Sequence, residues 1–384
     1  MNRIALQMLV GDKLKYLSLV AGLAFAALLV TQQSSIFTGY ALRVASWVRD
    51  TDHAADLWVM DPQAEFTEAN KPMLDTALNR VRSVQGVAWA MPIHKGYVKA
   101  RLPDGTLATV RVIGIDDATL IGAPPQMVEG ELSDLRRDRA VFMNADDAAK
   151  NLLLKRAAPP RPLRVGDSFS INDHEVTIVG SYRATPEFFW EPVFYTTYSR
   201  AIAIAPQERK KLSFVLVKVR PGEERAAVAR RIADVTGLKV LTGREFAWET
   251  TDYILQKTGI LVNFGLTIGL GFIIGALIAA QTLYTFVLEN LRHFAAIKAM
   301  GATNATIVRM VLLQVAVAGV IGYGIGLGAA CLTGALFGRH GLAFEMPWQI
   351  PVLGAVAILF CCVAAALFSL GRVLRLEPGI VFKA

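Results

Sequence analysis

The sequence contains four long stretches without a charged residue, and this absence determines the class of protein. They cover residues 16–42, 258–288, 310–338 and 346–371. Each is longer than the roughly 20 apolar residues that cross a ~30 Å hydrocarbon core, so the sequence predicts four membrane-spanning helices. Ion-coupled carriers usually hold an ionisable side chain near the bilayer centre, where it binds the coupling ion. Its absence from all four stretches argues against a secondary transporter.

Cysteine is also scarce. The three cysteines, Cys331, Cys361 and Cys362, all lie inside the charge-free stretches, and residues 43–257 contain none. A region without cysteine can form neither disulfides nor thiolate metal sites. Redox chemistry is therefore excluded from this long intervening region.

The motifs of several common enzymes are missing. No G-x-x-x-x-G-K-[ST] occurs, so the chain has no P-loop for ATP. Neither H-E-x-x-H nor G-x-S-x-G occurs, and the five histidines are scattered along the chain. We therefore expect this chain to supply no catalytic residues and to bind no metal or cofactor.

The positive charge of the chain is unevenly placed. The formal net charge is +8, but no dense basic run indicates nucleic-acid binding. Segment 339–345 holds Arg339 as its only Lys or Arg. The positive-inside rule places the more basic segments 1–15, 289–309 and 372–384 in the cytoplasm, together with both termini. Their cationic residues are Arg3, Lys13, Lys15, Arg292, Lys298, Arg309, Arg372, Arg375 and Lys383.

The first charge-free stretch, residues 16–42, is expected to remain as an uncleaved span. A cleaved signal peptide has a shorter apolar stretch that ends in small residues, and here Ala24-Phe25-Ala26 comes too early. The preceding residues 1–15 form either a helix at the inner membrane surface or a frayed terminus.

Residues 43–257 lie between the first two spans and alternate strand and helix patterns. Strands are expected at 87–93, 96–102 and 107–115, with the last two joined by the turn Pro103-Asp-Gly105. This region therefore forms a large α+β domain outside the cytoplasmic membrane.

This outer domain is expected to be divided. Residues 43–115 and 210–243 share a strand and helix pattern, which suggests one subdomain interrupted by a second at 116–209. Residues 244–257 contain no helix breaker and are expected to run as one helix, a stalk, into the second span. The expected fold is therefore a membrane protein of four transmembrane helices with a split α+β domain between the first and second.

Segment 289–309 is short and polar, yet its pattern is helical. Leu291, Phe294 and Lys298 recur at helical spacing, and Gly301 is a natural stop. A short helix between two spans has no core of its own and needs a partner to cover its apolar residues. We hypothesise that this segment docks a separate cytoplasmic subunit.

Two further patterns concern packing. The glycine pairs Gly271/Gly275 and Gly322/Gly326 lie in predicted spans, where small residues let helices approach closely. They pack helices either within one subunit or between two. In the outer domain, aromatic residues gather over 188–198 and form either core or a surface for a partner or a lipid-like ligand.

The layout of one span, a large outer domain and three further spans resembles the FtsX/MacB-like permeases of ATP-binding-cassette systems, most closely their separate-permease, DevC-like branch. Residues 292–303, R-H-F-A-A-I-K-A-M-G-A-T, resemble the family's R-E-I-G-x-L-K-A-L-G-A-T. Residues 376–380, L-E-P-G-I, resemble the family's closing P-x-x-A. His293 and Ala295 replace the usual Glu and Gly, so Glu289 becomes the candidate for the acidic contact to the partner.

The resemblance implies a homodimer in the bacterial inner membrane, bound to two copies of a separately encoded ATPase that binds the ATP. Closure of the ATPase would push on segment 289–309, and the stalks would carry the movement outward to porter-like and inserted Sabre-like subdomains. Exporters of this branch meet a periplasmic adaptor and a TolC-like outer-membrane duct. The residues that the resemblance assigns to ATPase coupling are Glu289, Arg292, His293, Phe294, Lys298, Met300, Gly301, Ala302 and Thr303.

Two classes of function remain open. One is export of a lipid-like or peptide substrate from the periplasm. The other is FtsX-type signalling, in which the outer domain switches a cell-wall hydrolase; a lipoprotein-release permease is a related alternative. A two-part outer domain favours export, because hydrolase-regulating relatives usually have a smaller one. A receptor is disfavoured, since the cytoplasmic segments are too small to hold an output domain.

Overall fold

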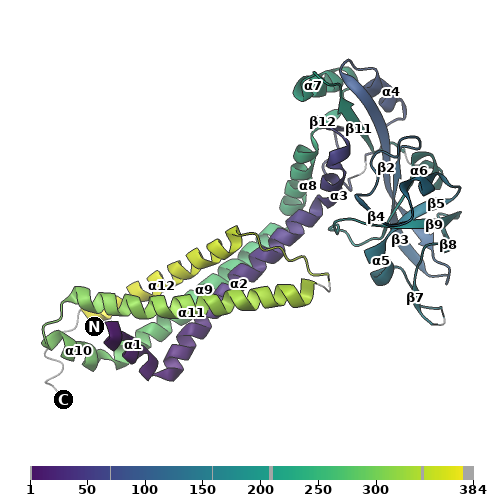
Figure 1. The fold of residues 1–384 in the computed structure, drawn as a ribbon. Coiled ribbons are helices and arrows are strands. Elements are labelled where there is room, and N and C mark those ends of the chain that lie inside the picture. The colour runs from purple at the N-terminus through teal and green to yellow at the C-terminus, as the bar shows by residue number, and fades with distance from the viewer. Residues whose placement is uncertain (1, 70, 158, 207–210, 339–340, 375–384) are drawn as a thin grey trace. The chain divides into compact units, whose positions relative to one another are not determined.

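The chain folds into two compact units. The computed structural model describes all residues except 1, 70, 158, 207–210, 339–340 and 375–384, so the expected tail 372–384 and the family-like residues 376–380 lie mostly or wholly outside the described part. One unit consists of Met1–Ala41 and Thr258–Ala384, and the other of Leu42–Lys257. We call them the membrane unit and the outer domain (Figure 1).

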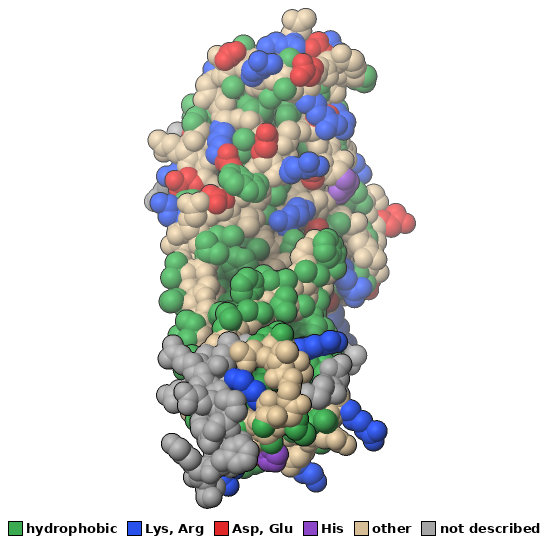
Figure 2. Space-filling view, turned by 90° about the vertical axis from the view of Figure 1, so that its left-hand side faces the viewer, with side chains coloured by type: hydrophobic (Ala, Val, Ile, Leu, Met, Phe, Trp, Pro, Cys, Tyr) green, Lys and Arg blue, Asp and Glu red, His purple; other side chains and the backbone are tan. Residues whose placement is uncertain are grey.

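Four helices of the described chain are long and apolar enough to cross a membrane. They are α2 (Lys13–Val44), α9 (Ile260–Glu289), α11 (Asn304–Gly338) and α12 (Gln349–Leu374). In the face shown by Figure 2, hydrophobic side chains gather over these helices, whereas Lys, Arg, Asp and Glu side chains are spread over the outer domain. Two short helices complete the membrane unit, α1 (Asn2–Gly11) and α10 (Leu291–Ala299).

Helix α1 packs on the membrane bundle. Its buried residues Ala5 and Leu9 join the same apolar cluster as Val311 and Val315 of α11. The side-chain amide of Gln314 donates a hydrogen bond to the Ala5 carbonyl oxygen, 2.8 Å away. The N-terminal segment is therefore a helix held by the bundle.

The glycine pairs lie where helices approach one another closely within this chain. A Cβ built on Gly275 of α9 would lie 2.2 Å from the Ala26 Cβ of α2, and one on Gly271 would meet Leu29. On α11, Gly322 and Gly326 face α2 in the same way. Both pairs therefore let α2 contact its neighbours at backbone distance, as small residues do in lipid, where tight packing drives association.

Replacing Gly326 by alanine is expected to destabilise the membrane unit. The added methyl would lie 2.4 Å from the Ala24 carbonyl oxygen and 2.6 Å from the Ala27 Cβ, and overpacking of this kind costs about 1–3 kcal/mol. Thermal unfolding of the detergent-solubilised protein measures the loss. Gly328→Ala is the matched control, because its Cβ would meet nothing within 4 Å. Equal melting temperatures for the two variants would contradict the close contact of α2 and α11.

The outer domain begins with a four-stranded antiparallel arrangement in the order β12-β1-β11-β2. These strands are β1 (Leu57–Met60), β2 (Val87–Arg101), β11 (Phe214–Val219) and β12 (Lys239–Leu241). Helices α4 (Thr76–Arg82) and α7 (Arg225–Thr236) contribute Val81, Val228 and Ile232 to the core formed with Val215 and Val217.

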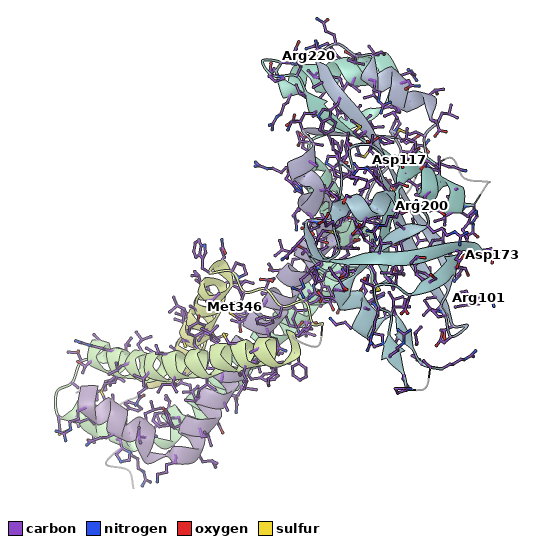
Figure 3. The ribbon with its side chains drawn as sticks, turned by 45° about the vertical axis from the view of Figure 1, so that its right-hand side comes forward. Arg101, Asp117, Asp173, Arg200, Arg220 and Met346 are labelled. Atoms are coloured by element: carbon purple, nitrogen blue, oxygen red, sulfur yellow. The ribbon has the colours of Figure 1, made fainter. Side chains whose placement is uncertain are left out.

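The remaining elements of the outer domain lie between β2 and β11 in the sequence. They are β3 (Leu107–Ile115), β4 (Gln126–Glu129), β5 (Ala140–Asn144), α5 (Ala145–Lys150), β6 (Leu153–Leu154), β7 (Arg161–Pro162), β8 (Ser168–Ile171), β9 (His174–Arg183), β10 (Val193–Thr197) and α6 (Tyr198–Ile204). The sheet continues from β2 through β3, β10, β5, β9 and β4, with β8 paired to both β2 and β9. In this part, Asp117 accepts hydrogen bonds from the N–H and hydroxyl of Ser199, at 3.2 and 3.0 Å, near the start of α6; Arg200 follows in the same helix (Figure 3). Strands β6 and β7 form a separate two-stranded sheet.

The expected separation of strands 87–93 and 96–102 is wrong, because β2 is one strand of 15 residues. Its first half pairs with β11 and its second half, from His94, pairs with β3. One strand thus belongs to both parts of the sheet. Strand β3, which the sequence analysis grouped with the first subdomain, pairs with the second half of β2.

The expected continuous stalk is also wrong. Helix α8 (Gly243–Lys257) ends before α9 begins, and Gly259 between them has φ +69°. A left-handed backbone cannot continue a right-handed helix, and glycine adopts it without steric cost. The second span is therefore a separate helix from the last helix of the outer domain.

Candidate coupling site

Helix α10 has a buried face and an exposed face. Phe294, Ala295 and Ile297 are buried in the apolar cluster of the membrane unit or beside it. Arg292 and His293 are exposed, and Met300 directly after the helix is 80% exposed. Phe294, assigned above to coupling, thus holds α10 on the bundle and offers no surface to a partner.

The end of α10 is a Schellman motif centred on Gly301. The Ala302 N–H donates to the Ile297 carbonyl at 3.2 Å, and the Gly301 N–H donates to the Lys298 carbonyl at 3.0 Å. This pair of hydrogen bonds requires a left-handed residue after the helix, and Gly301 has φ +96°. The prediction that Gly301 stops this helix with a backbone geometry that suits glycine is confirmed.

Thr303 starts the next helix. Helix α11 begins at Asn304, and the Thr306 N–H donates to the Thr303 hydroxyl at 3.3 Å, which is how a threonine N-cap satisfies an unpaired helical N–H. Gly301 and Thr303 therefore build a tight corner between α10 and α11. Within the family-like sequence 292–303, Gly301 and Thr303 are thus needed for the local structure, as the end of one helix and the start of the next.

Glu289 is engaged within the chain. It forms an ion pair with Lys15 near the start of α2, and Lys15 also lies 2.8 Å from Asp12. The hydrogen bond from Lys15 lowers the pKa of the Asp12 carboxyl below its usual value. The Glu289 side chain is 55% exposed, so a partner could reach it. Because Glu289 is paired with Lys15, the partner would have to compete with Lys15.

Four buried aromatic rings fix the first and last helices of the outer domain to its sheet. Trp47 of α3 (Ser46–Thr51) lies 5.2 Å from Trp58 of β1, and Phe246 of α8 lies 5.5 Å from the same ring. Both also pack on Phe214 of β11. The points where the chain enters and leaves the outer domain are therefore joined through one aromatic core.

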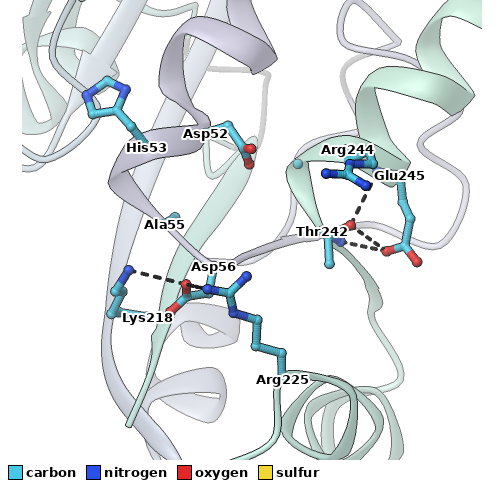
Figure 4. Close-up of a pocket in the computed structure, with 10 residues that line it drawn as sticks. Asp52, His53, Ala55, Asp56, Lys218, Arg225, Thr242, Arg244 and Glu245 are labelled. Carbon is cyan, nitrogen blue, oxygen red and sulfur yellow. Dashed lines mark hydrogen bonds and ion pairs between the residues drawn. The ribbon is translucent and has the colours of Figure 1, made fainter. Parts of the chain in front are cut away.

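A hollow of about 650 Å³ lies beside the start of α8 (Figure 4). Thr242 and Glu245 form a reciprocal capping box there, with hydrogen bonds of 2.8 to 3.3 Å. Asp56 is paired with Lys218 at 3.2 Å and Arg225 at 3.0 Å. Glu245 is thus used for helix capping, and Asp56, Lys218 and Arg225 are used for ion pairing.

A buried charge cluster connects β2 and β3 with two loops, and nothing in the sequence pattern predicted it. Lys95 lies 2.6 Å from Glu68, and Arg111 pairs with Glu68 at 3.1 Å and with Glu187. Burial acts to raise the pKa of the Glu68 carboxyl, but the Lys95 and Arg111 cations outweigh it and hold that pKa below its usual value. The available signal was Arg111, the one cation of the otherwise mostly apolar strand β3.

The aromatic residues of 188–198 differ in burial. Tyr195 is buried in the core beside Tyr182, with ring centroids 5.1 Å apart. Trp190, in contrast, is 78% exposed. Within the described residues, no group of His, Cys, Asp and Glu side chains could hold a metal ion.

Comparison with known proteins places both units in one family. Residues 265–378 match the family described as FtsX-like permease C-terminal, and residues 18–235, more than half of the chain, match the MacB-like periplasmic core domain. The search of curated proteins gave no match.

Solved structures were also compared. The extracellular domain of the noncanonic ABC-type transporter YknZ from Gram-positive bacteria is 16% identical, with 49% of this chain and 98% of that chain covered and a TM-score of 0.34. The periplasmic region of MacB from Actinobacillus actinomycetemcomitans is 9% identical, with 52% and 96% covered and a TM-score of 0.37. From the two family matches, this chain belongs to the FtsX/MacB-like permeases of ATP-binding-cassette systems, with a large periplasmic domain between its first and second membrane helices.

Proposed function

We propose that this chain is the membrane subunit of an export system of the DevC-like branch, in which a separate ATPase binds and hydrolyses ATP. The ATPase docks on α10 and on the corner around Gly301, and its closure moves the periplasmic domain by mechanotransmission. The chain itself contributes no catalytic residue and no cofactor. The observation that carries the proposal is the α10 surface, with Arg292, His293 and Met300 exposed around a helix whose other face is buried.

The proposed assembly is a homodimer in the inner membrane, with both termini in the cytoplasm. Helix α9 supports a dimer because it is the least covered of the four spans; Leu266, Leu270 and Leu277 are among its exposed side chains. A periplasmic adaptor and a TolC-like duct would receive a lipid-like or peptide substrate from the periplasmic domain.

A pull-down of the tagged chain from membranes in mild detergent tests this function. Mass spectrometry should identify an ATP-binding-cassette ATPase together with an adaptor. An ATPase with a cell-wall hydrolase or its activator would instead indicate FtsX-type signalling, and an ATPase with a lipoprotein carrier would indicate lipoprotein release. Absence of any ATPase would overturn the coupling role of segment 289–309.

Met300→Glu should reduce ATPase recovery about tenfold or more, because we expect Met300 to be an interface hot spot, which contributes about 2 kcal/mol or more, and 1.4 kcal/mol is a tenfold change in affinity. Because Met300 is 80% exposed, its replacement removes little packing inside the chain. The variant should therefore keep the melting temperature and the gel-filtration profile of the wild type. Unchanged ATPase recovery would place the docking surface elsewhere.

A further inference from the structure

The loop of residues 184–192 in the periplasmic domain, here called the aromatic loop, is fixed by hydrogen bonds from side chains of the domain to its backbone carbonyls. Arg111 donates to the carbonyl oxygens of Phe189 at 3.0 Å and Glu191 at 3.3 Å. The amide of Asn151 donates to the Trp190 carbonyl at 3.0 Å. Three successive carbonyls are therefore fixed, while the Trp190 ring points to the outside with 78% of the residue exposed.

The Arg111 side chain that makes two of these hydrogen bonds belongs to the domain core. The Arg111 side chain is almost completely buried and also pairs with Glu187 at the start of the loop and with Glu68. Phe188 and Phe189 pack edge to face, with ring centroids 5.2 Å apart. A loop fixed in this way loses little conformational entropy when it binds, which is the condition for an effective aromatic anchor.

The aromatic loop lies beside the end of the first membrane helix. The Phe188 N–H donates to the Arg43 carbonyl at 3.2 Å, and Arg43 is the first residue after the charge-free stretch 16–42. The N–H and hydroxyl of Thr185 both donate to the Asp50 carboxylate at 2.9 Å. Two residues of extended chain span at most about 7 Å, so the backbone of Trp190 lies within that distance of the Phe188 backbone.

The chemistry at this place fits a lipid surface. The end of a charge-free span marks the level of the headgroups, where tryptophan is enriched because its ring is apolar and its N–H is polar. Two cations lie at the same level, Arg43 and Arg49, and the Arg49 guanidinium donates to the Leu42 carbonyl at 2.6 Å. Cations at the surface attract anionic phospholipids.

We infer that the aromatic loop is a membrane anchor, in which Trp190 enters the headgroup region of the outer leaflet crossed by α2. The occupant of this surface is phospholipid. The anchor ties the periplasmic domain to the lipid surface at a second place besides its two chain connections, and it does so whether the protein exports a substrate or signals.

Quenching of tryptophan fluorescence by brominated lipid tests the anchor. The full chain is placed in nanodiscs of phosphatidylcholine and phosphatidylglycerol, with or without bromine on the acyl chains close to the headgroups. The Trp190 contribution is the wild-type emission minus that of Trp190→Phe. It should fall about twofold in the brominated lipid, because a ring at headgroup level contacts the bromine.

Two matched variants calibrate the experiment. Trp348→Phe reports a tryptophan directly before α12 in the membrane unit and should also reveal a quenched contribution. Trp89→Phe reports a half-buried tryptophan of β2, paired in the sheet with Lys218, and should reveal an unquenched one. Gel filtration and circular dichroism check that each variant is folded.

A Trp190 contribution that is equal in both lipids, and quenched by acrylamide from the water, would overturn the inference. That result would also be expected if the aromatic loop served a protein partner alone. If Trp190→Phe does not fold, Trp190→Tyr supplies the same difference spectrum, because tyrosine is also a large aromatic side chain with a polar group and emits at shorter wavelength.

Discussion

Gly301→Val is expected to lower the amount of ATPase that co-purifies with the chain about tenfold or more. Gly301 has φ +96°, and a β-branched residue held in such a backbone costs about 1–3 kcal/mol. The cheaper outcome for the variant is to break the Schellman hydrogen bonds and change the angle between α10 and α11. Because 1.4 kcal/mol corresponds to a tenfold change in affinity, the loss is measurable in a quantitative pull-down from membranes.

Gly301→Asn is the matched control for this experiment. Asparagine adopts left-handed geometry more readily than other non-glycine residues, and a Cβ at this position would meet no atom within 4 Å. The asparagine variant should therefore retain most of the ATPase. If the valine and asparagine variants lose the same amount of ATPase, the loss comes from replacing glycine as such. The argument from the left-handed backbone is then wrong.

Arg111→Gln should destabilise the periplasmic domain strongly. The substitution leaves the carboxylate of Glu68, whose side chain is 7% exposed, and the partly buried carboxylate of Glu187 with Lys95 as the remaining cation of the cluster. Removal of one partner from a buried ionic cluster typically costs about 3–5 kcal/mol. In a domain of this size, each kcal/mol shifts the melting temperature by about 2–4 °C. Thermal unfolding of the full chain in detergent should show a decrease on the order of 10 °C.

Arg111→Lys separates the charge from the shape of this side chain. Lysine preserves the positive charge but lacks the planar fork that reaches the carbonyls of Phe189 and Glu191. It should therefore lose less stability than glutamine, while proteolysis within the aromatic loop becomes faster. A glutamine variant that melts like the wild type would show that the cluster contributes no net stability.

The membrane helices could be predicted from the sequence because a bilayer sets a length and a polarity that a chain must match. The same is true of Gly301, whose position after a helical pattern indicates a stop, and the structure confirms its geometry. These features depend on residues that are close together in the sequence. Local chemistry was sufficient for them.

The features that could not be predicted depend on distant residues. Lys95 and Gly96 interrupt the apolar pattern of β2, yet the strand continues through them, and Lys95 is paired with Glu68, a residue distant in the sequence. The burial of one face of α10 also depends on residues that are distant in the sequence. Phe294 looked like a contact for a partner, but its neighbours are residues of other helices in the membrane unit.

The membrane unit and the periplasmic domain are connected by two chain segments of unequal stiffness. Helix α2 runs without interruption from Lys13 to Val44, past the last residue of the membrane unit, and a helix resists bending because hydrogen bonds close each of its turns. The second segment contains Thr258 and Gly259, which belong to neither α8 nor α9. Changes of orientation are absorbed by a few residues at the ends of elements. The chain therefore passes between the two units through a continuous helix at one connection and through two non-helical residues at the other.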